Sequence, residues 1–416
     1  MTDENFLASI DIGSSKIVIF LAEEKNGKLE IFGHARGSSA GINKGEIIDI
    51  EEVAAAIKRV KKKAILSCDT KFDNVSVNIS DPNLTVINAS PNIHISGKVK
   101  QSDVNTVVQT AQSKIPPNQQ LISKVTQCCT LDKDPVTNQG IIVKQPIGEK
   151  AQNLEISMHI VTASNQCVEE IDNSLKQSEL GLFNIVPNSM ASSEPYLTKD
   201  EKDKGVCLVD IGSGVTDFSV FNKEGILYSS SVPSGAGQAT RDIMDAFNTS
   251  FEEAERLKIE YGWVQAKAIT EDKLVSFKQI DDSNYYYLSY ESLTEVIEDF
   301  YLELFSLIRT KLKQQNLYRS LNAGFVLVGG GAKIKGCDIL MRGCFKKKAK
   351  IGRVNTDLIG VNISVVSSND DLLAPEYACA LGLLLFKPDK FDSEQQLSNA
   401  KGIFGKIKRQ RARFSI

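Results

Sequence analysis

The stretch "LASIDIGSSKIVIF", from Leu7 to Phe20, decides the fold of this chain. It places a carboxylate, a glycine and two hydroxyls between two apolar segments, and the second segment, from Ile17 to Phe20, is β-branched and aromatic. A P-loop or a dinucleotide-binding glycine motif opens a helix directly after its first strand, whereas this pattern continues as a second strand. The stretch therefore predicts a β-hairpin that turns at Gly13, with Asp11 at the end of the first strand.

The same pattern occurs a second time, as "GVCLVDIGSGVTDFSVF" from Gly205 to Phe221. Each copy is followed by a turn and a further short strand, so each predicts a meander of β-strands. Asp-Gly-Ser is common in ordinary turns, but two copies, each behind an apolar strand, favour a shared chemical role. Tight glycine turns direct successive backbone N–H groups into one concavity, and such a concavity binds phosphate.

The two hairpins together predict a site for phosphate groups and a magnesium ion. Asp11 and Asp210 each end a strand just before the turn, and Mg²⁺ is typically held by one or two carboxylates together with phosphate oxygens. Lys16 adds a positive charge and Thr216 a hydroxyl. The residues expected to contact the phosphates or the ion are Asp11, Gly13, Ser14, Ser15, Lys16, Asp210, Gly212, Ser213, Gly214, Val215 and Thr216.

A third glycine cluster lies in "AGFVLVGGGAKIKG", from Ala323 to Gly336, where a strand leads to three glycines and a helix is expected from about Ile334. Bare glycine backbone lets a flat group lie close to the chain. Upstream, Glu255 and Lys258 stand three apart on one helix face, which fits either a surface ion pair or a contact to a ribose and base. The expected nucleoside contacts are Glu255, Lys258, Gly329, Gly330, Gly331 and Ala332.

The composition of the 416-residue chain is near the globular average, with a formal net charge of −3, so no general attraction to nucleic acid is expected. The N-terminus lacks a signal-peptide pattern, and the longest apolar stretch, "ACALGLLLF", falls short of the ~20 residues that a membrane span needs. Eight cysteines without CxxC spacing and three unpaired histidines predict buried thiols rather than zinc sites or disulfides. We expect a soluble, cytoplasmic body.

Two phosphate hairpins followed by a glycine-rich loop resemble the actin, sugar-kinase and DnaK superfamily. Within it the chain is similar to the FtsA family of actin-like bacterial division proteins, also in "KGEIIDIEEVAAAIKRV", "SGAGQATRDIMDAF" and "LTEVIEDFYLELFSLI". The resemblance implies an α/β, actin-like two-lobed fold with ATP and Mg²⁺ in a central cleft. It also implies that Gly237 contacts the nucleotide.

The resemblance further implies a division into subdomains. Lobe one would be subdomain 1A at residues 1–80 and 161–204, with an FtsA-type subdomain 1C inserted at 81–160, and lobe two would be subdomain 2A at 205–250 and 323–386, ending in a closing helix, with subdomain 2B inserted at 251–322. The residues of the first insert support a small α+β module. Alternating strand patterns precede a helix that begins after Ser102 or Asp103, and Pro116 and Pro117 stop it.

The chain changes character after Phe386. Residues 387–400 are polar and predict a flexible linker, and residues 401–416, "KGIFGKIKRQRARFSI", carry six basic residues and no acidic one. At helical spacing Ile403, Phe404, Ile407 and Phe414 share one face, the pattern of a basic amphipathic helix at a membrane surface. A disordered basic tail or a nucleic-acid arm is the alternative, and the family's terminal membrane helix favours the first interpretation.

The resemblance implies a nucleotide-dependent scaffold that polymerises and recruits later division proteins. It would bind the FtsZ C-terminal tail through subdomain 2B and hold the FtsZ ring to the anionic inner membrane, on its cytoplasmic face at the division septum. Alternatives are a PilM-like type IV pilus assembly protein, or a sugar kinase or DnaK-type ATPase of the same superfamily.

Two segments depart from the family pattern. Separately, the rate of ATP hydrolysis is expected to be low. The second hairpin reads Gly-Ser-Gly-Val-Thr where family members show Gly-Gly-Gly-Thr-Thr, which removes one hydroxyl but keeps the backbone. In subdomain 2B, Phe300 stands where the family has a basic residue, which bears on the FtsZ contact. ATP hydrolysis needs a residue that orients water, and Asn188 and Glu194 are the candidates, so at most a slow ATPase is expected.

Overall fold

The computed structural model describes residues 6–134, 136–280, 284–362, 371–387, 389 and 391. The chain forms two compact units. The larger comprises Met1–Leu84, Gln166–Lys223 and Tyr228–Phe386, and the smaller comprises Thr85–Asn165, Glu224–Leu227 and Lys387–Ile416. The expected membrane-facing residues Ile403, Phe404, Ile407 and Phe414 lie outside the described residues.

The first sheet of the larger unit has six strands in the order β12-β6-β1-β2-β3-β20. The strands are β1 (Phe6–Ile12), β2 (Lys16–Lys25), β3 (Lys28–Ser38), β6 (Asn74–Ile79), β12 (Gly181–Pro187) and β20 (Ile359–Val361). β1, β2 and β3 form an antiparallel meander, and β6 lies parallel to β1. Asp11 pairs with Val18 one residue before the strand ends, as the hairpin prediction requires.

The second sheet repeats this plan in the order β15-β14-β13-β18-β19. Its strands are β13 (Val206–Ile211), β14 (Thr216–Asn222), β15 (Gly225–Val232), β18 (Gly324–Val328) and β19 (Ala349–Ile351). β13 and β14 form the antiparallel hairpin, and β18 lies parallel to β13 as β6 does to β1. Both predicted hairpin meanders are therefore confirmed, and neither glycine turn opens a helix.

Nine α-helices are found among the described residues of the larger unit. A short hairpin precedes the first helix, and its strands β4 (Ile42–Asn43) and β5 (Glu46–Ile47) have two residues each. The helices are α1 (Ile50–Cys68), α3 (Asn165–Gln177, from the last residue of the smaller unit), α4 (Asn188–Tyr196), α5 (Lys199–Lys204), α6 (Gly237–Phe247), α7 (Phe251–Tyr261), α8 (Tyr290–Gln314), α9 (Cys337–Phe345) and α10 (Ala378–Leu385). Helix α10 packs against α4 and is buried over seven of its residues, so its apolar sequence serves the core. In the described ranges no helix is both long and apolar enough to cross a membrane.

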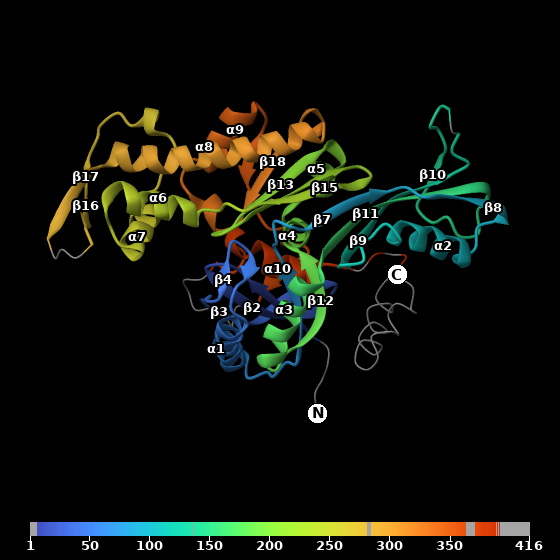
Figure 1. The fold of residues 1–416 in the computed structure, drawn as a ribbon, viewed down its shortest axis with the longest axis horizontal. Coiled ribbons are helices and arrows are strands. Elements are labelled where there is room, and N and C mark those ends of the chain that lie inside the picture. The colour runs from blue at the N-terminus through green and yellow to red at the C-terminus, as the bar shows by residue number, and fades with distance from the viewer. Residues whose placement is uncertain are drawn as a thin grey trace. The chain divides into compact units, whose positions relative to one another are not determined.

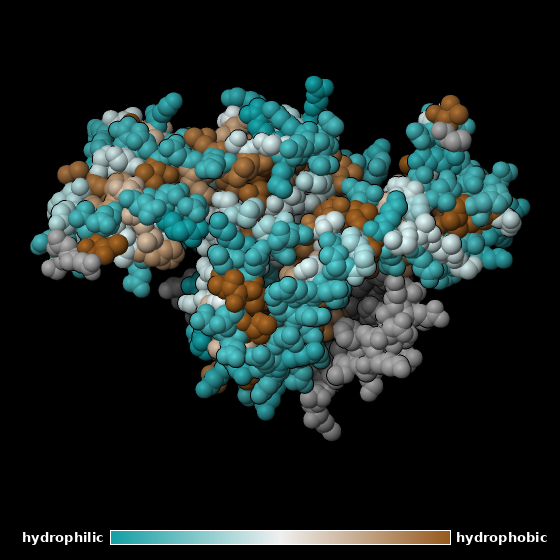
Figure 2. Space-filling view, viewed as in Figure 1, coloured by the Kyte–Doolittle hydropathy of each residue, from teal (hydrophilic) through white to brown (hydrophobic). Residues whose placement is uncertain are grey.

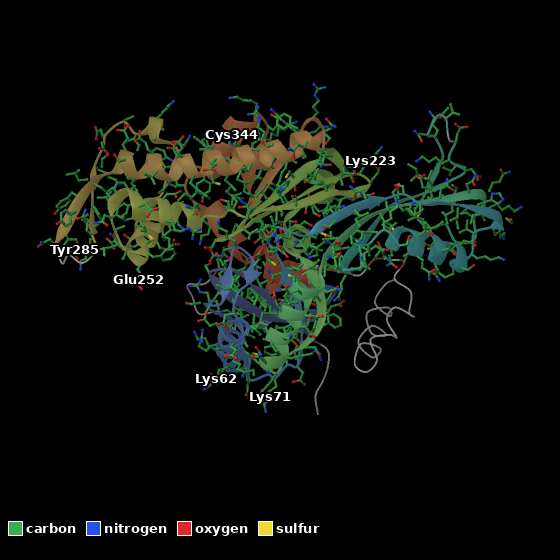
Figure 3. The ribbon with its side chains drawn as sticks, in the orientation of Figure 1. Lys62, Lys71, Lys223, Glu252, Tyr285 and Cys344 are labelled. Carbon is green, nitrogen blue, oxygen red and sulfur yellow. The ribbon has the colours of Figure 1, made fainter. Side chains whose placement is uncertain are left out.

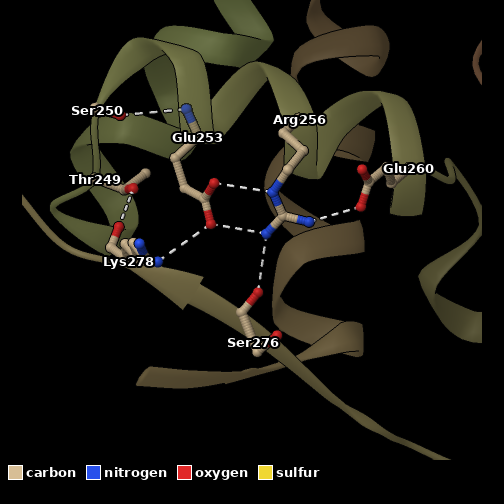
Figure 4. Close-up of polar contacts among 7 residues, drawn as sticks. All are labelled: Thr249, Ser250, Glu253, Arg256, Glu260, Ser276 and Lys278. Atoms are coloured by element: carbon tan, nitrogen blue, oxygen red, sulfur yellow. Dashed lines mark hydrogen bonds and ion pairs between the residues drawn. The ribbon is translucent and has the colours of Figure 1, made fainter. Parts of the chain in front are cut away.

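The helical module between β15 and β18 contains α6, α7 and α8 and the hairpin of β16 (Leu274–Lys278) and β17 (Tyr285–Ser289). The hairpin lies at one end of α8 (Figure 1), where the side chain of Tyr285 is found, with Glu252 on the neighbouring α7 (Figure 3). Ser250 caps α7 by accepting from the N–H of Glu253. Arg256 binds the Glu253 carboxylate through two nitrogens and donates to the Ser276 carbonyl at 3.0 Å, which fastens α7 to β16 (Figure 4).

The smaller unit is a mixed module of one sheet and one helix. Its strands are β7 (Thr85–Ala89), β8 (Asn92–Lys98), β9 (Gln119–Leu131), β10 (Ile141–Val143) and β11 (Lys150–Ser164), and its helix is α2 (Gln101–Gln112). The sheet order is β10-β9-β11-β7, with β8 also paired to β11. The predicted strands and helix are present, because alternating residues of β11 and the apolar face of α2 form one core.

Two predicted helix starts differ from the structure. The helix expected after Ser102 or Asp103 begins at Gln101, since Lys100 is the N-cap and its N–H donates to the Asp103 carboxylate at 2.7 Å. The helix expected from Ile334 instead begins at Cys337, and a short 3₁₀ helix at Gly330–Lys333 precedes it. Ile334 is extended, and Gly336 has a φ of +83°, a left-handed conformation that separates the two helices. Gly336 is therefore the N-cap of α9, and Ile334 is the C-cap of the 3₁₀ helix.

The surface and the thiols agree with a globular protein. In the view of Figure 2 the surface is largely hydrophilic, with apolar residues in separate groups. No disulfide joins any of the eight cysteines, all of which lie in the described ranges. Four of them, Cys129, Cys207, Cys337 and Cys379, are buried as predicted, and the other four are partly exposed.

The close packing of α10 on α4 predicts a large effect of one methyl group. A Cβ added at Gly382 would collide with the carbonyl group of Ala191, so Gly382→Ala should lower the free energy of unfolding by about 1–3 kcal/mol. Gly343 is the matched control, because it is exposed on α9 and an added Cβ meets no atom within 4 Å. Gly343→Ala should be neutral or stabilising by up to about 1 kcal/mol in urea denaturation. Equal losses in both variants would contradict this packing.

Candidate functional site

Both hairpin turns and the glycine loop line one cleft of the larger unit, with a volume of about 820 Å³. The predicted residues that line it are Asp11, Gly13, Ser14, Ser15, Lys16, Asp210, Gly212, Ser213, Gly214, Val215, Gly237, Glu255, Lys258, Gly329, Gly330 and Gly331. Thr216 and Ala332 do not line it. The Thr216 hydroxyl donates to the Ser234 carbonyl at 2.8 Å, and Ala332 is buried behind the loop.

The two hairpins are closed in the same way. The N–H of Gly13 donates to the Lys16 carbonyl at 3.0 Å, and the N–H of Gly212 donates to the Val215 carbonyl at 3.0 Å. The residues between these bonds line the cleft in both copies. The backbone is thus arranged twice as expected for a turn that binds phosphate.

The start of α6 holds the second hairpin. The N–H of Ala236 donates to the Gly212 carbonyl and that of Gly237 to the Ser213 carbonyl, both at 2.8 Å. A Cβ at Gly237 would lie 2.7 Å from the Ser213 hydroxyl, and one at Gly235 would lie 2.6 Å from the Gly212 oxygen. Glycine at both positions is therefore what lets the helix start approach the turn, and the sequence analysis did not single out Gly235.

Two buried carboxylates face this cleft from the ends of β1 and β13. Burial raises the pKa of Asp11 to about 6, Lys16 opposes the shift, and the nearby charge of Asp210 adds to it. Burial also raises the pKa of Asp210, although Ser192 donates to its carboxylate at 2.5 Å and Asn188 at 3.0 Å. A divalent cation would relieve the repulsion between the two carboxylates, so they fit a Mg²⁺ that completes its shell with phosphate oxygens and water.

A third buried carboxylate, Asp217, was missed by the sequence analysis. It pairs with Asp210 across the β13–β14 hairpin, accepts from the Ser80 hydroxyl at 2.5 Å and from the Ser231 hydroxyl, and lines the cleft. Burial raises its pKa to about 7. The only signal in the sequence was a carboxylate inside the apolar strand "TDFSVF".

Only one of the two candidates for orienting water lies at the site. Asn188 lines the cleft, and its amide oxygen accepts from Asn78 at 3.4 Å. Asn78 in turn accepts from the N–H of Ile12 at 2.7 Å, which ties it to the first hairpin. Glu194 does not line the cleft and pairs with Lys202 at 3.5 Å.

The ion pair of α7 is part of the cleft wall. Glu255 and Lys258 are 2.7 Å apart, and the Lys258 amino group also donates to the Ala236 carbonyl at 2.9 Å and the Thr240 hydroxyl at 2.6 Å. Lys258 is only 8% exposed, and burial lowers its pKa against the pull of Glu255. The buried Lys258 thus pairs with a partly exposed Glu255, and both line the cleft. A contact of this pair with a ribose and base stays a prediction.

The glycine loop is fixed from both sides. Gly329 has a φ of +85°, and a Cβ there would collide with the Asp210 carboxylate. The Tyr301 hydroxyl of α8 donates to the Gly331 carbonyl at 2.7 Å, a buried bond. An added Cβ at Gly330, by contrast, meets no atom within 4 Å. The loop therefore leaves bare backbone at the cleft with room above it.

Lys16 is held by the segment that precedes α10. Its amino group donates to the Glu376 carbonyl at 2.8 Å and lies 4.8 Å from the centre of the Tyr377 ring. Burial lowers its pKa, and Asp11 opposes that shift. Within the described ranges, no cluster of three or more His, Cys, Asp and Glu side chains is placed to bind a metal ion.

Comparison with known proteins gives consistent results along most of the chain. The family model "Cell division protein FtsA" matches residues 207–382, and "SHS2 domain inserted in FTSA" matches residues 82–162. The cell division protein FtsA of Pseudomonas aeruginosa is 29% identical over 395 residues, which cover 94% of this chain and 91% of that protein. FtsA of Escherichia coli K12 is 28% identical over 393 residues, covering 92% and 90%.

Solved structures resemble the fold at lower identity. A PilM-PilN type IV pilus biogenesis complex aligns with a TM-score of 0.63 at 19% identity, covering 91% of this chain and 97% of that one. MreB5 of Spiroplasma citri bound to ADP aligns with a TM-score of 0.54 at 13% identity, covering 96% and 99%. The MamK double helical filament aligns with a TM-score of 0.51 at 12% identity, covering 92% and 99%. These likenesses show the actin-like fold alone.

Two substitutions test the cleft by isothermal titration calorimetry. Asp210→Asn keeps the shape of the side chain but removes a charge that would bind the ion, so ATP should bind at least about tenfold more weakly in Mg²⁺. Gly330→Trp should fold, since the site has room, and should abolish binding by filling the cleft. In EDTA the Asp210→Asn difference should disappear. Wild-type affinity of both variants in Mg²⁺ would refute the site.

The buried Asp217 predicts a pH-dependent stability. Its pKa rises from 3.8 to about 7 on folding, so the unfolded chain releases the proton first and stability falls as pH rises from about 4 to 7. Asp217→Asn removes this loss. The unfolding free energy of Asp217→Asn minus that of the wild type should therefore increase with pH, by 1.36 kcal/mol for each pH unit between the two pKa values. The increase should reach about 4 kcal/mol at most. It should level off above pH 7. Urea denaturation from pH 5 to 8 without nucleotide measures this, and a constant difference would contradict it.

Proposed function

The chain belongs to the FtsA family, and we propose that it is an ATP-binding, actin-like cell division protein that polymerises and links the FtsZ ring to the cytoplasmic membrane. The sequence relatives cover nearly its whole length. The pilus protein of the first alternative resembles it in fold at 19% identity, which does not carry a function. A sugar kinase or a chaperone has no support among these sequence relatives.

One observation carries the nucleotide part of the proposal. The two phosphate hairpins, Asp11 and Asp210, the Glu255–Lys258 pair and the glycine loop come from distant parts of the chain and line the same cleft. ATP with Mg²⁺ accounts for each part: the hairpins hold the phosphates, the carboxylates hold the ion, and the pair and the loop hold the ribose and base. Asn188 is the residue left to orient a water, so turnover is expected to be slow.

For the FtsZ contact we propose the exposed surface of the helical module, at residues 251–322. Phe300, which replaces a basic residue of the family pattern, is 4% exposed and packs edge-on against Tyr301. It belongs to the core of α8 and offers a partner no surface. Leu302 and Leu307 of the same helix are about 40% exposed and supply apolar area instead.

For the inserted module we propose self-association or recruitment of later division proteins. Its core is formed by apolar residues of α2, β9 and β11, and the cleft residues all lie in the larger unit. The module therefore contributes no group to the nucleotide site, which leaves its surface for contacts with other proteins.

For membrane attachment we propose the amphipathic tail at residues 401–416. Four large apolar side chains on one helix face bury in the interface, and each nearby basic residue adds about 1 kcal/mol at an anionic leaflet. Ordering the helix costs about 1–2 kcal/mol per residue of backbone, so a single tail binds weakly. A filament that presents many tails gains avidity of ~10²–10⁴. Attachment should therefore depend on polymerisation, and thus on nucleotide.

Flotation with anionic vesicles tests the whole proposal. The wild-type protein should float with vesicles in ATP and Mg²⁺, and more FtsZ should float when this protein is present. Asp210→Asn should float less because it polymerises less. Phe404→Asp and Ile407→Asp should stay in solution, because each puts a charge into the apolar face.

Ser415→Asp is the matched control, since it adds the same charge off that face, and it should float nearly as the wild type does. High salt should weaken flotation of the wild type. A chain truncated after Ser393 that floats as well as the full chain would refute the tail, and flotation that ignores nucleotide would refute its coupling to polymerisation.

A further inference from the structure

Two residues that follow the closing helix are bound to the inserted module. The Asp389 carboxylate accepts the backbone N–H of Thr126 and, at 3.0 Å, the Thr126 hydroxyl. The N–H of Phe391 donates back to the same carboxylate at 2.9 Å. One side chain thus satisfies three donors, two of them on β9. These residues fall within the segment expected to be a flexible linker, at 387–400.

The site exists because β9 has an open edge. In the sheet order β10-β9-β11-β7, the short strand β10 pairs only with residues Cys129 to Leu131 of β9. Edge strands present unpaired N–H and C=O groups that attract another segment. Here Asp389 takes the N–H of Thr126, and the neighbouring Gln127 side chain donates to the Ile226 carbonyl at 2.6 Å. Two distant segments of the chain therefore cover this edge.

Phe391 adds an apolar anchor beside the polar one. It is 5% exposed and belongs to the core cluster of the module, which includes Leu131 of β9, Leu154 of β11 and Val107 of α2. Helix α2 covers one face of the sheet (Figure 1). A phenylalanine ring exposed in a solvated linker would add no stability to the fold, whereas burial of the ring in this core is favourable in free energy.

We propose that Asp389 and Phe391 form a clamp that fixes the chain to β9 of the inserted module, so that the C-terminal tail is tethered to this module. The inserted module thus binds a short Asp-x-Phe segment through one carboxylate and one aromatic ring. The linker predicted from the sequence at residues 387–400 would then begin only after the clamp, at residue 392. For a flexible coil the r.m.s. reach then falls from about 20 Å to about 16 Å.

The effect of the clamp on membrane attachment rests on the proposed function of the tail, but the clamp itself does not. Its test therefore uses the full chain without vesicles, nucleotide or FtsZ. Trypsin cleaves after lysine, and the bond between Lys390 and Phe391 lies inside the clamp, whereas Pro388 protects the bond after Lys387. Cleavage after Lys390 and hydrogen exchange of peptides covering residues 121–131 and 386–396 report directly on the clamp.

The expected result is slow cleavage after Lys390 in the wild type and cleavage about tenfold faster in Asp389→Asn and Phe391→Ala. Exchange in both peptides should rise in these variants and stay unchanged in peptides from the nucleotide cleft. Thr126→Val should behave like Asp389→Asn, and Thr126→Ser, which keeps the hydroxyl, should restore the wild-type rates. Phe391→Leu, which keeps most of the apolar area, should lie between wild type and Phe391→Ala.

Equal cleavage of wild type, Asp389→Asn and Phe391→Ala would overturn the clamp. A cleavage rate that slows as protein concentration rises would overturn the intramolecular form, because it would mean that the segment of a second copy fills the site. If Phe391→Ala opens the whole module, Asp389→Asn and Thr126→Val decide the matter by the same two measurements. Vesicle flotation is scored separately, so a tail that fails to bind lipid does not count against the clamp.

Discussion

The burial of three carboxylates beside one cleft is the constraint on which the larger unit depends, and the charge of Asp210 adds to the effect of burial on Asp11 and Asp217. Asp11, Asp210 and Asp217 lie at or beside the strand ends of two sheets, and burial raises the pKa of each. A folded protein gains nothing from such groups unless a positive partner joins them, because isolated buried charges are costly. Lys16 supplies one positive charge, and a cation with its phosphates supplies the rest. Carboxylates with perturbed pKa values in one cleft are typical of functional sites. Here their burial lowers the stability of the fold, and the same carboxylates are the groups expected to bind the cation.

Close approach of backbone to backbone is the second requirement of this cleft. The α6 start reaches the Gly212–Gly214 turn only because residues 235 and 237 lack a Cβ, and Gly329 passes the Asp210 carboxylate for the same reason. The Tyr301 hydroxyl then fixes the loop to α8. The long helix that carries the hairpin of β16 and β17 is thereby connected to the loop expected to hold the base.

Most of the site follows from local sequence, and the rest depends on register. Hairpins, glycine turns and the i,i+3 pair on α7 are local patterns, so they were predicted correctly. Thr216 was expected at the site because of its hydroxyl. Strand residues alternate between faces, however, and the pairing of Asp210 with Asp217 places Asp217 at the cleft instead of Thr216. Asn78 reaches the cleft from β6, 66 residues after Ile12. No local sequence pattern predicts that Asn78 lies at the cleft, because only the parallel pairing of β6 with β1 places it there.

The segment after the closing helix shows how composition alone can mislead. Residues 387–400 are polar on average, which predicts a flexible linker, yet a single phenylalanine and one aspartate within them find partners on an open strand edge. Averages over a window hide such isolated anchors, because one buried ring and one saturated carboxylate suffice to hold a chain. None of the module's described residues lines the nucleotide cleft, and Asp389 is bound at the open edge of its strand β9. If this module also contacts neighbouring copies, as proposed, the same small fold would join the contacts that build a filament to the segment that carries the tail.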